Sequence, residues 1–427
     1  MNQKDPGNNN QNIWLFNQYA VTPGQPGGTR HYAISRILVG RGYRVTLFAS
    51  GFNYQKREEL KCTGAEDFKI EFCDGVRFVW LRTLPYQKNN WKRIVNMLSY
   101  SWRCLRVYKK LLKADQVEKP ETIIGSAVHL FAVWTAYRVA KKLKANFVME
   151  VRDLWPMTLV EFRKELKYHP IVVFFRMLDR FLAKRAQRII CVLPGAYDYY
   201  KKYGIAKEKV VWIPNGVDTS LYCSGSPTPP ETVQPKRFKV MYTGSFGMEA
   251  CLQTLLSAAK FIQEKQLPIA FEIIGSGEKQ KELEQFKNQL GLQNVMFREP
   301  VKKEMIPTVL AAADALWIGS RKVKNLYKYG FSFNKLFEYL AAGKPILFSI
   351  DAAYNPVKEA GAGITIPPED SEALSNAIIQ FYEMPTAERI KIGQKGIAYA
   401  KEFHDFEKLA DRFDQLLVFL ASARRNS

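Results

Sequence analysis

A lysine and a glutamate stand three positions apart in the sequence SFNKLFEYLAAGKPI, so on a helix Lys335 and Glu338 would share one face. Ser332 or Asn334 can cap this helix, and Gly343 can end it. A helix N-terminus with a lysine in its first turn favours a diphosphate, and a carboxylate can bind ribose hydroxyls. The segment therefore predicts a nucleotide-sugar site, although a surface ion pair on a capped helix is the alternative.

A second group of ionisable residues occurs in the sequence EVRDLWP. Glu150, Arg152 and Asp153 stand at the end of an apolar strand predicted for residues 146–151, and ligands of α/β sheets bind at the carboxyl ends of strands. Asp153 can act on a sugar hydroxyl or on charge that develops there. The alternative is an Arg152–Asp153 pair that holds the loop. We take Asp153, Arg152 and Glu338 as candidate catalytic residues.

Three glycine loops follow predicted strands. Gly27 and Gly28 precede Arg30 after the first strand, where a phosphate site and a simple tight turn fit equally well. In the second half of the chain the loops TGSFG and IGSG can bring backbone close to a phosphate or a base. The candidate donor-binding residues are therefore Gly27, Gly28, Arg30, Gly244, Ser245, Gly275, Arg298, Arg321, Ser332, Asn334, Lys335 and Glu338. By contrast, the sequence NGVD at residues 215–218 is typical of a fixed turn.

The chain carries a net charge of +22, which attracts phosphates, anionic membranes or nucleic acid. Residues 88–113 hold eight lysines and arginines and no acid, with apolar residues near helical spacing. A basic amphipathic helix with tryptophans is typical of membrane-surface binding, and a packed helix with a solvated basic face is the alternative. The predicted membrane residues are Trp91, Lys92, Arg93, Trp102, Arg103 and Arg106.

Several classes of protein are disfavoured. The six cysteines include no C-x-x-C pair and the four histidines no H-E-x-x-H pair, so we expect reduced thiols and no metal site. The sequence has neither a D-x-D triplet nor a P-loop, which argues against a metal-dependent transferase and against ATP hydrolysis. It also lacks an apolar signal segment and a run that could span a bilayer.

Short β-rich runs alternate with helical segments along the chain, which predicts parallel sheets. The predicted strands of the first half are residues 13–17, 43–49, 76–81, 122–126, 146–151 and 188–193, and those of the second half are 239–243, 270–274, 295–298, 315–318, 345–349 and 363–366. Residues 224–235 are rich in proline, serine and threonine and predict a linker. We expect an α/β protein with domains at 1–220 and 237–404, a linker at 221–236, and a C-terminal helix at 405–427 that packs back on the first domain.

The order of these motifs resembles the retaining glycosyltransferases of the GT4 group, which have the GT-B fold of two doubly wound, Rossmann-like domains facing a cleft. Within the group the chain is similar to the WbuB-like branch, associated with N-acetyl-L-fucosamine transfer. The resemblance implies a donor site in the second domain and an acceptor site in the first. It implies that Glu338 binds ribose, that residues 332–335 meet the diphosphate, that Gly27 and Gly28 approach the donor phosphate, and that Asp153 lies near the reacting sugar.

The chain departs from the family pattern at three places. Gly330 stands where the first glutamate of the E-x7-E pattern is expected, and Arg152 stands where many relatives have histidine. The basic residues often found after the YxG loop are missing from residues 245–250. We therefore expect the diphosphate to depend more on Lys335, Arg30 or Arg321.

The resemblance and the basic helix together predict a cytoplasmic, peripheral membrane enzyme without a cofactor. It would transfer a sugar from a UDP-sugar such as UDP-N-acetyl-L-fucosamine to a polyprenyl-diphosphate-linked saccharide, as in surface polysaccharide synthesis. Fixed cations and helix N-termini can stabilise a leaving diphosphate without a metal. A sugar-nucleotide epimerase on the same fold is one alternative. A nucleic-acid-binding protein is another, but no motif for nucleic acid supports it.

Overall fold

The computed structural model describes residues 11–88, 90–162, 164–223, 237–323 and 327–425. The chain forms two compact units, which are described separately. The first consists of Met1–Pro214 and Leu409–Ser427, and the second of Asn215–Lys408.

The first unit is built on an eight-stranded sheet with the order β10-β9-β8-β7-β1-β2-β6-β5. All neighbours are parallel except β5, which is antiparallel to β6. The strands are β1 Asn12–Phe16, β2 Arg44–Ser50, β5 Phe68–Cys73, β6 Val76–Leu81, β7 Thr122–Ser126, β8 Asn146–Val151, β9 Arg188–Cys191 and β10 Val210–Trp212, with a separate pair β3 Phe52–Asn53 and β4 Glu58–Glu59. Every residue of β1, β7 and β8 is buried, as expected for strands covered on both faces.

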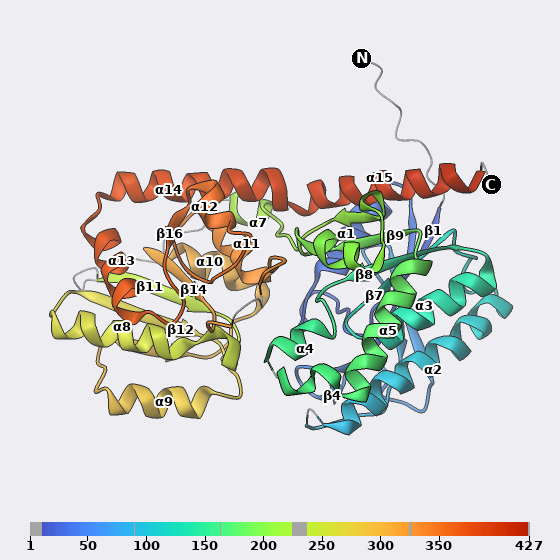
Figure 1. Ribbon diagram of the computed structural model, residues 1–427, viewed down its shortest axis with the longest axis horizontal. Coiled ribbons are helices and arrows are strands. Elements are labelled where there is room, and N and C mark those ends of the chain that lie inside the picture. The colour runs from blue at the N-terminus through green and yellow to red at the C-terminus, as the bar shows by residue number, and fades with distance from the viewer. Residues whose placement is uncertain (1–10, 89, 163, 224–236, 324–326, 426–427) are drawn as a thin grey trace, which may run out of the picture. The chain divides into compact units, whose positions relative to one another are not determined.

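Helices cover this sheet. They are α1 Arg30–Gly40, α2 Trp91–Lys113, α3 Leu130–Leu143, α4 Met157–Phe162, α5 Pro170–Arg185, α6 Ala196–Tyr200 and most of α15 Phe406–Arg425. Contacts join α2 to α3 and α3 to α5, and the three helices lie side by side in Figure 1.

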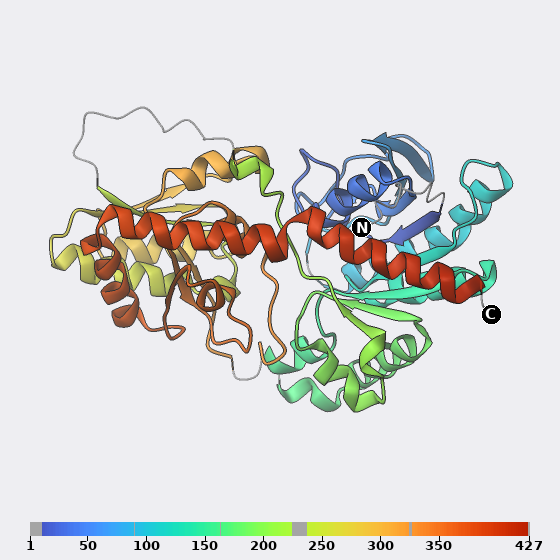
Figure 2. The ribbon, with the colours of Figure 1, turned by 90° about the horizontal axis from the view of Figure 1, so that it is seen from above.

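The C-terminal helix α15 packs on the first unit (Figure 2). Its buried residues recur at helical spacing and are Leu409, Ala410, Phe413, Leu416, Leu417 and Leu420. The side chain of Asn146, at the start of β8, donates a hydrogen bond to the carbonyl of Leu420 at 3.3 Å. Near the start of β2, Arg41 forms an ion pair with Asp411 at 2.8 Å. The helix therefore completes the first unit from the far end of the sequence.

The second unit holds a six-stranded parallel sheet with the order β13-β12-β11-β14-β15-β16. Its strands are β11 Phe238–Thr243, β12 Ile269–Ile274, β13 Val295–Arg298, β14 Ala315–Gly319, β15 Ile346–Ser349 and β16 Gly363–Thr365. Its helices are α7 Ser220–Cys223, α8 Leu252–Glu264, α9 Gln280–Gln289, α10 Ile306–Ala311, α11 Asn334–Ala341, α12 Pro356–Ala360, α13 Ser371–Glu383 and α14 Thr386–Tyr399. The strand order reverses between β7 and β1 in the first sheet and between β11 and β14 in the second, so both sheets are the predicted Rossmann-like type.

One domain boundary and one strand differ from the prediction. The first unit ends at Pro214, before the predicted boundary at 220, because the following segment is bonded into the second unit. Val217 pairs with Asp405 as an isolated bridge, and the Asn215 amide bonds Ser332. The antiparallel strand β5 is absent from the prediction because its residues are only half-buried or exposed, which gives no apolar run. The predicted linker lies largely at residues 224–236, outside the described residues.

Candidate active site

The three ionisable residues at the end of β8 differ sharply in exposure. Glu150 is completely buried, Arg152 is half-buried, and Asp153 is exposed. Within the described part of the chain, no hydrogen bond is found to the side chain of Asp153, so its carboxylate is available to a ligand. Glu150 instead has an internal role.

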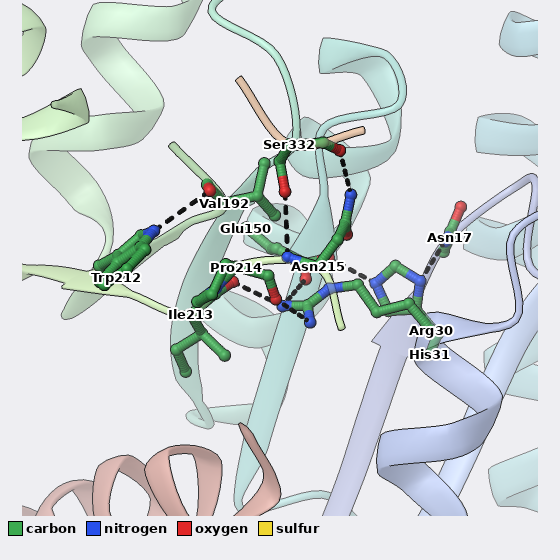
Figure 3. Close-up of polar contacts among 10 residues, drawn as sticks. All are labelled: Asn17, Arg30, His31, Glu150, Val192, Trp212, Ile213, Pro214, Asn215 and Ser332. Atoms are coloured by element: carbon green, nitrogen blue, oxygen red, sulfur yellow. Dashed lines mark hydrogen bonds and ion pairs between the residues drawn. The ribbon is translucent and has the colours of Figure 1, made fainter. Parts of the chain in front are cut away.

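Glu150 binds the first two residues of α1 (Figure 3). Its Oε2 lies 2.5 Å from Nε2 of His31, and its Oε1 lies 3.3 Å from Nη2 of Arg30. Asn17, which follows β1, holds the other ring nitrogen of His31 at 2.7 Å. Burial alone would raise the pKa of Glu150, but His31, Arg30 and Arg152 outweigh it and lower that pKa. Glu150 is therefore ionised and joins β8 to the start of α1.

The prediction that Arg30 binds the donor diphosphate is contradicted by its surroundings. Only 3% of the side chain is exposed, and the guanidinium donates to the carbonyls of Pro214 at 2.8 Å and Ile213 at 2.9 Å, as Figure 3 shows. Burial lowers its pKa to about 10, and Glu150 counteracts the effect. Since Glu150 needs an internal cation, Arg30 is held inside the unit, where it fixes the last residues before the chain enters the second unit.

The glycine loop before α1 contains one residue whose backbone favours glycine. Gly27 has φ 144°, and a Cβ there would lie 3.0 Å from Val21. The side chain of Asn53 donates to the carbonyl of Pro26 at 3.0 Å. These contacts explain Gly27 by the turn itself, and a role for Gly27 and Gly28 toward a donor phosphate stays a prediction.

The two glycine loops of the second unit pack directly on each other. Gly275 has φ 148°, and a Cβ there would lie only 1.8 Å from the carbonyl oxygen of Gly244. The amide of Gly244 donates to Ile274 at 2.9 Å, and the amide of Phe246 donates to Ser276 at 2.8 Å. The loops after β11 and β12 therefore form one packed unit at the carboxyl edge of the sheet, and Gly275 is required for this close approach.

Lys335 is fixed against the first of these loops. Its Nζ lies 2.6 Å from the Tyr242 hydroxyl and 4.2 Å from the centre of the Tyr242 ring. That hydroxyl donates to the carbonyl of Ser245 at 2.8 Å. Gly244 has φ 144°, which favours glycine, and a Cβ there would lie 2.7 Å from Nζ of Lys335, so the lysine would have to shift. Burial lowers the pKa of Lys335 to about 8, and Glu338 and Glu249 counteract it.

Helix α11 begins at Asn334 and places Glu338 one turn after Lys335. Burial raises the pKa of Glu338, and Lys303 and Lys335 oppose this shift. Among the described residues, no hydrogen-bond partner is found for the Glu338 carboxylate. The sequence thus placed Lys335 and Glu338 correctly on one helix, with a cation and an available carboxylate close together.

The predicted capping of this helix by Ser332 or Asn334 is wrong. Phe333 occupies the capping position, and no side chain bonds the first turn. The hydroxyl of Ser332 accepts from the amide of Asn215 at 3.1 Å, and the side chain of Asn215 donates to the carbonyl of Ser332 at 2.7 Å (Figure 3). The polar groups of Ser332 therefore bond the NGVD turn. This agrees with the interpretation of residues 215–218 as a fixed turn. Asn334 is exposed in the first turn.

Gly330, which replaces the first glutamate of the family pattern, is buried and has φ 92°. This conformation favours glycine, and a glutamate would be strained there. The replacement of the family's glutamate by Gly330 therefore coincides with a backbone conformation that favours glycine. Of the remaining predicted cations, Arg298 donates to Glu272 at 3.3 Å, and Arg321 is exposed after β14.

The predicted membrane residues divide into two groups. Trp91 and Trp102 are 65% and 49% exposed, and Ile94 and Leu98 continue the same exposed apolar stripe along α2. Cations lie beside this stripe. The guanidinium groups of Arg106 and Arg103 lie 4.5 Å and 5.2 Å from the centre of the Trp102 ring. The ammonium group of Lys92 lies 6.0 Å from the centre of the Trp91 ring. A second stripe on α5 consists of Ile171, Phe174, Met177 and Phe181.

Two of the predicted membrane arginines are engaged elsewhere. Arg103 forms an ion pair with Asp67. Arg93 is partly buried and interacts with the hydroxyls of Tyr19, Tyr86 and Tyr54. Arg93 therefore does not belong to the exposed stripe, because residue 93 lies on the inner side of α2, as does the buried Asn96.

Neither a bilayer-spanning helix nor a metal cluster is found among the described residues. None of these helices combines the length and hydropathy needed to cross a bilayer. Their histidines, cysteines and acidic residues form no group of three that could hold a metal ion.

Substituting Glu150 with glutamine should destabilise the protein by about 3–5 kcal/mol, because Arg30 and His31 would lose their buried counter-charge. Glu118 provides a matched control, since it pairs on the surface of the same unit with Arg77 at 3.0 Å. Glu118→Gln should cost less than about 1 kcal/mol. Denaturant unfolding measures both, and equal costs would show that Glu150 does not hold the strand end.

Two family profiles match consecutive parts of the chain. The profile of Glycosyltransferase Family 4 matches residues 27–221, and that of Glycosyl transferases group 1 matches residues 237–384. A curated relative is the putative colanic acid biosynthesis glycosyl transferase WcaI of Escherichia coli (strain K12). It is 22% identical over 364 residues, which cover 82% of this chain and 86% of WcaI.

Solved structures share the fold over nearly the whole chain. Sucrose-phosphate synthase from Thermosynechococcus elongatus aligns with a TM-score of 0.75 at 18% identity, covering 97% of this chain and 100% of that one. Anabaena HepE in complex with UDP-glucose aligns with a TM-score of 0.65 at 16% identity, covering 95% and 99%. These alignments confirm the predicted GT-B fold. Both profiles describe glycosyltransferases and together match most of the described residues, so the chain is a glycosyltransferase, and its first half matches family 4.

Proposed function

We propose that this enzyme transfers a sugar from a UDP-sugar, with retention of configuration, to a polyprenyl-diphosphate-linked saccharide during surface polysaccharide synthesis. The observation that carries the proposal is Lys335, a cation held 2.6 Å from the Tyr242 hydroxyl at the carboxyl edge of the sheet, one helical turn from the available carboxylate of Glu338. Two similar proteins support the proposal: HepE has been solved in complex with UDP-glucose, and WcaI is a putative colanic acid biosynthesis glycosyl transferase. The WbuB-like resemblance favours UDP-N-acetyl-L-fucosamine as donor.

In this proposal the donor binds the second unit. Lys335 and the N-terminus of α11 neutralise the diphosphate as the bond from the sugar to the leaving oxygen breaks. Glu338 accepts hydrogen bonds from the ribose hydroxyls. The loops at Gly244, Ser245 and Gly275 form the adjoining wall, and Arg298 and Arg321 add positive potential. Arg30 has no part, because its guanidinium is bonded inside the first unit.

The first unit would supply the acceptor side. Asp153, with Arg152 beside it, would orient a hydroxyl of the donor or the acceptor, since its carboxylate is exposed at the end of β8. Gly27 and Gly28 would bring backbone close to the donor phosphate. No covalent role is assigned to Asp153.

The exposed stripe of Trp91, Ile94, Leu98 and Trp102, flanked by Lys92 and Arg106, would hold the enzyme on an anionic, cytoplasmic membrane surface. Tryptophans at such an interface bury apolar area while neighbouring cations bind lipid phosphates. A lipid-linked acceptor is found at that surface, so docking would place the enzyme beside its substrate.

Glu338→Ala should weaken UDP binding by roughly tenfold or more, because a buried hydrogen-bonding partner of ribose is lost. Glu383→Ala, at the exposed end of α13, is the matched control and should leave the affinity unchanged. Titration calorimetry with UDP, GDP and ADP measures both variants. Unchanged UDP affinity in Glu338→Ala would refute the nucleotide assignment, and tighter binding of GDP or ADP would refute the choice of base.

UDP affinity should fall by about tenfold from about pH 7 to about pH 9, because Lys335, whose pKa is about 8, loses its proton over that range. The UDP phosphates are already ionised there, so their charge stays constant. Lys335→Gln should bind UDP weakly at both pH values. A pH dependence that persists in Lys335→Gln would assign it to another group.

Replacing Trp91 and Trp102 together with alanine should lower binding to vesicles of anionic lipid by roughly tenfold or more, because two interfacial side chains are removed. Phe72→Ala removes an aromatic ring that is equally exposed on β5 of the same unit, and should have no effect. Vesicle sedimentation measures binding. Equal losses in both proteins would exclude α2 as the docking surface.

A further inference from the structure

Arg93 lies in the first turn of α2 but points away from the exposed stripe. Burial works to lower its pKa, yet the phenolic oxygens of Tyr19, Tyr86 and Tyr54 outweigh this and raise it. One arginine is therefore surrounded by three tyrosines. Neither the family assignment nor the proposed donor site gives this cluster a role.

The three tyrosines follow neighbouring parallel strands. Tyr19 comes after β1, Tyr54 after β2 and the short strand β3, and Tyr86 after β6. The rings of Tyr19 and Tyr54 lie 4.7 Å apart. Because β1, β2 and β6 are adjacent and parallel, the cluster occupies the carboxyl edge of the sheet, where ligands of such sheets bind.

A hydrogen-bonded network of uncharged side chains lies next to the cluster. The side chain of Gln18 lies 2.6 Å from Nε2 of His129 and donates to Asn96 at 2.5 Å. Asn96 in turn donates to Thr83 at 2.9 Å. Burial lowers the pKa of His129 to about 3, and Arg93 adds to the shift, so the imidazole is uncharged at neutral pH. The network contributes no charge that would compensate Arg93.

The cluster itself is incompletely bonded. Nε of Arg93 is a buried atom for which the described part of the chain offers no hydrogen-bond partner, and it lies beside the Tyr19 hydroxyl with which the guanidinium interacts. No ion pair joins Arg93 to an acidic residue in that part. Lys92 and Arg93 also occupy the first turn of α2, where the helix dipole disfavours cations and no acidic residue is present. A partly buried cation that has no acidic partner and stands beside hydroxyl donors is suited to an anion with several oxygens.

We propose that Arg93, with the hydroxyls of Tyr19, Tyr54 and Tyr86, binds a phosphate of the lipid-linked acceptor. The identity of the acceptor rests on the proposed function, whereas the anion site rests on the cluster alone. A phosphate could also come from the donor nucleotide. The acceptor is favoured because the same helix turn carries Trp91, whose exposed ring suits a lipid surface.

The test measures binding of farnesyl diphosphate, farnesol and UDP to the full chain by titration calorimetry. Farnesyl diphosphate carries the diphosphate and an isoprenoid chain, and farnesol lacks the charge. Wild-type protein should bind farnesyl diphosphate at least roughly tenfold more tightly than farnesol. Arg93→Gln should weaken farnesyl diphosphate binding by roughly tenfold and leave UDP binding unchanged. Lys109→Gln removes an equal charge from the exposed face of α2 and should change neither.

Tyr19→Phe separates binding from folding. It removes only the hydroxyl and keeps the ring, so the melting temperature should change little while farnesyl diphosphate binding falls several-fold. This variant also decides the question if Arg93→Gln does not fold.

Three results would overturn the proposal. These are absence of farnesyl diphosphate binding to the wild type, unchanged binding in Arg93→Gln or Tyr19→Phe, and an equal loss in Lys109→Gln. Loss of UDP binding in Arg93→Gln would assign the site to the donor and also refute it. Wild-type protein could also bind farnesyl diphosphate through Arg93 and bind no nucleotide. That result would support the anion site and refute the proposed transfer reaction.

Discussion

A carboxylate inside a strand that is buried on both faces is the constraint from which much of the first unit follows. Glu150 stands near the carboxyl end of β8, a strand in which every residue is buried. An isolated charge there would be costly, so cations must reach it. Arg30 and His31 supply them from the start of α1, and Arg30 also binds the carbonyls of Ile213 and Pro214. One buried charge thus fixes the glycine loop before α1, the strand end that carries Asp153, and the point where the chain leaves the unit.

The second unit depends on a comparable constraint, the placement of a lysine against a tyrosine. Lys335 lies over the Tyr242 ring beside Gly244, which has no side chain to displace it, and the loop of Gly244 can lie there because Gly275 permits close contact between the two loops. The glycines therefore act through packing. Their effect on a ligand is indirect: they allow a cation with a lowered pKa to stand at the edge of the sheet, beside the carboxylate of Glu338.

The sequence predicted both sheets, because largely apolar runs such as Asn12–Phe16 and Ala315–Gly319, which are buried throughout, have few other stable arrangements. It also placed Lys335 and Glu338 on one helix, because residue spacing determines a helical face. It failed where a polar residue has a choice of partners. Ser332 was expected to cap α11 but bonds Asn215, and Arg30 was expected at a phosphate but bonds Glu150. Such choices depend on residues more than a hundred positions away, which spacing does not reveal. Strand β5 was missed because its edge position removes the apolar signal.

The basic surface shows why charge alone is a poor guide to function. Lys92 and Arg93 are neighbours in a run of cations that the sequence assigned to one membrane-binding face. In the structure Lys92 lies beside the exposed Trp91, whereas Arg93 lies among three tyrosines. The difference arises because consecutive residues on a helix are about 100° apart, so a single basic segment serves two surfaces. The outer surface can hold a membrane through many weak, interchangeable contacts. The inner surface has a single arginine next to a hydrogen-bonded network of uncharged side chains, and this arrangement suits one phosphate in one position. A helix with both surfaces can therefore hold a lipid bilayer and the head group of one lipid at the same time.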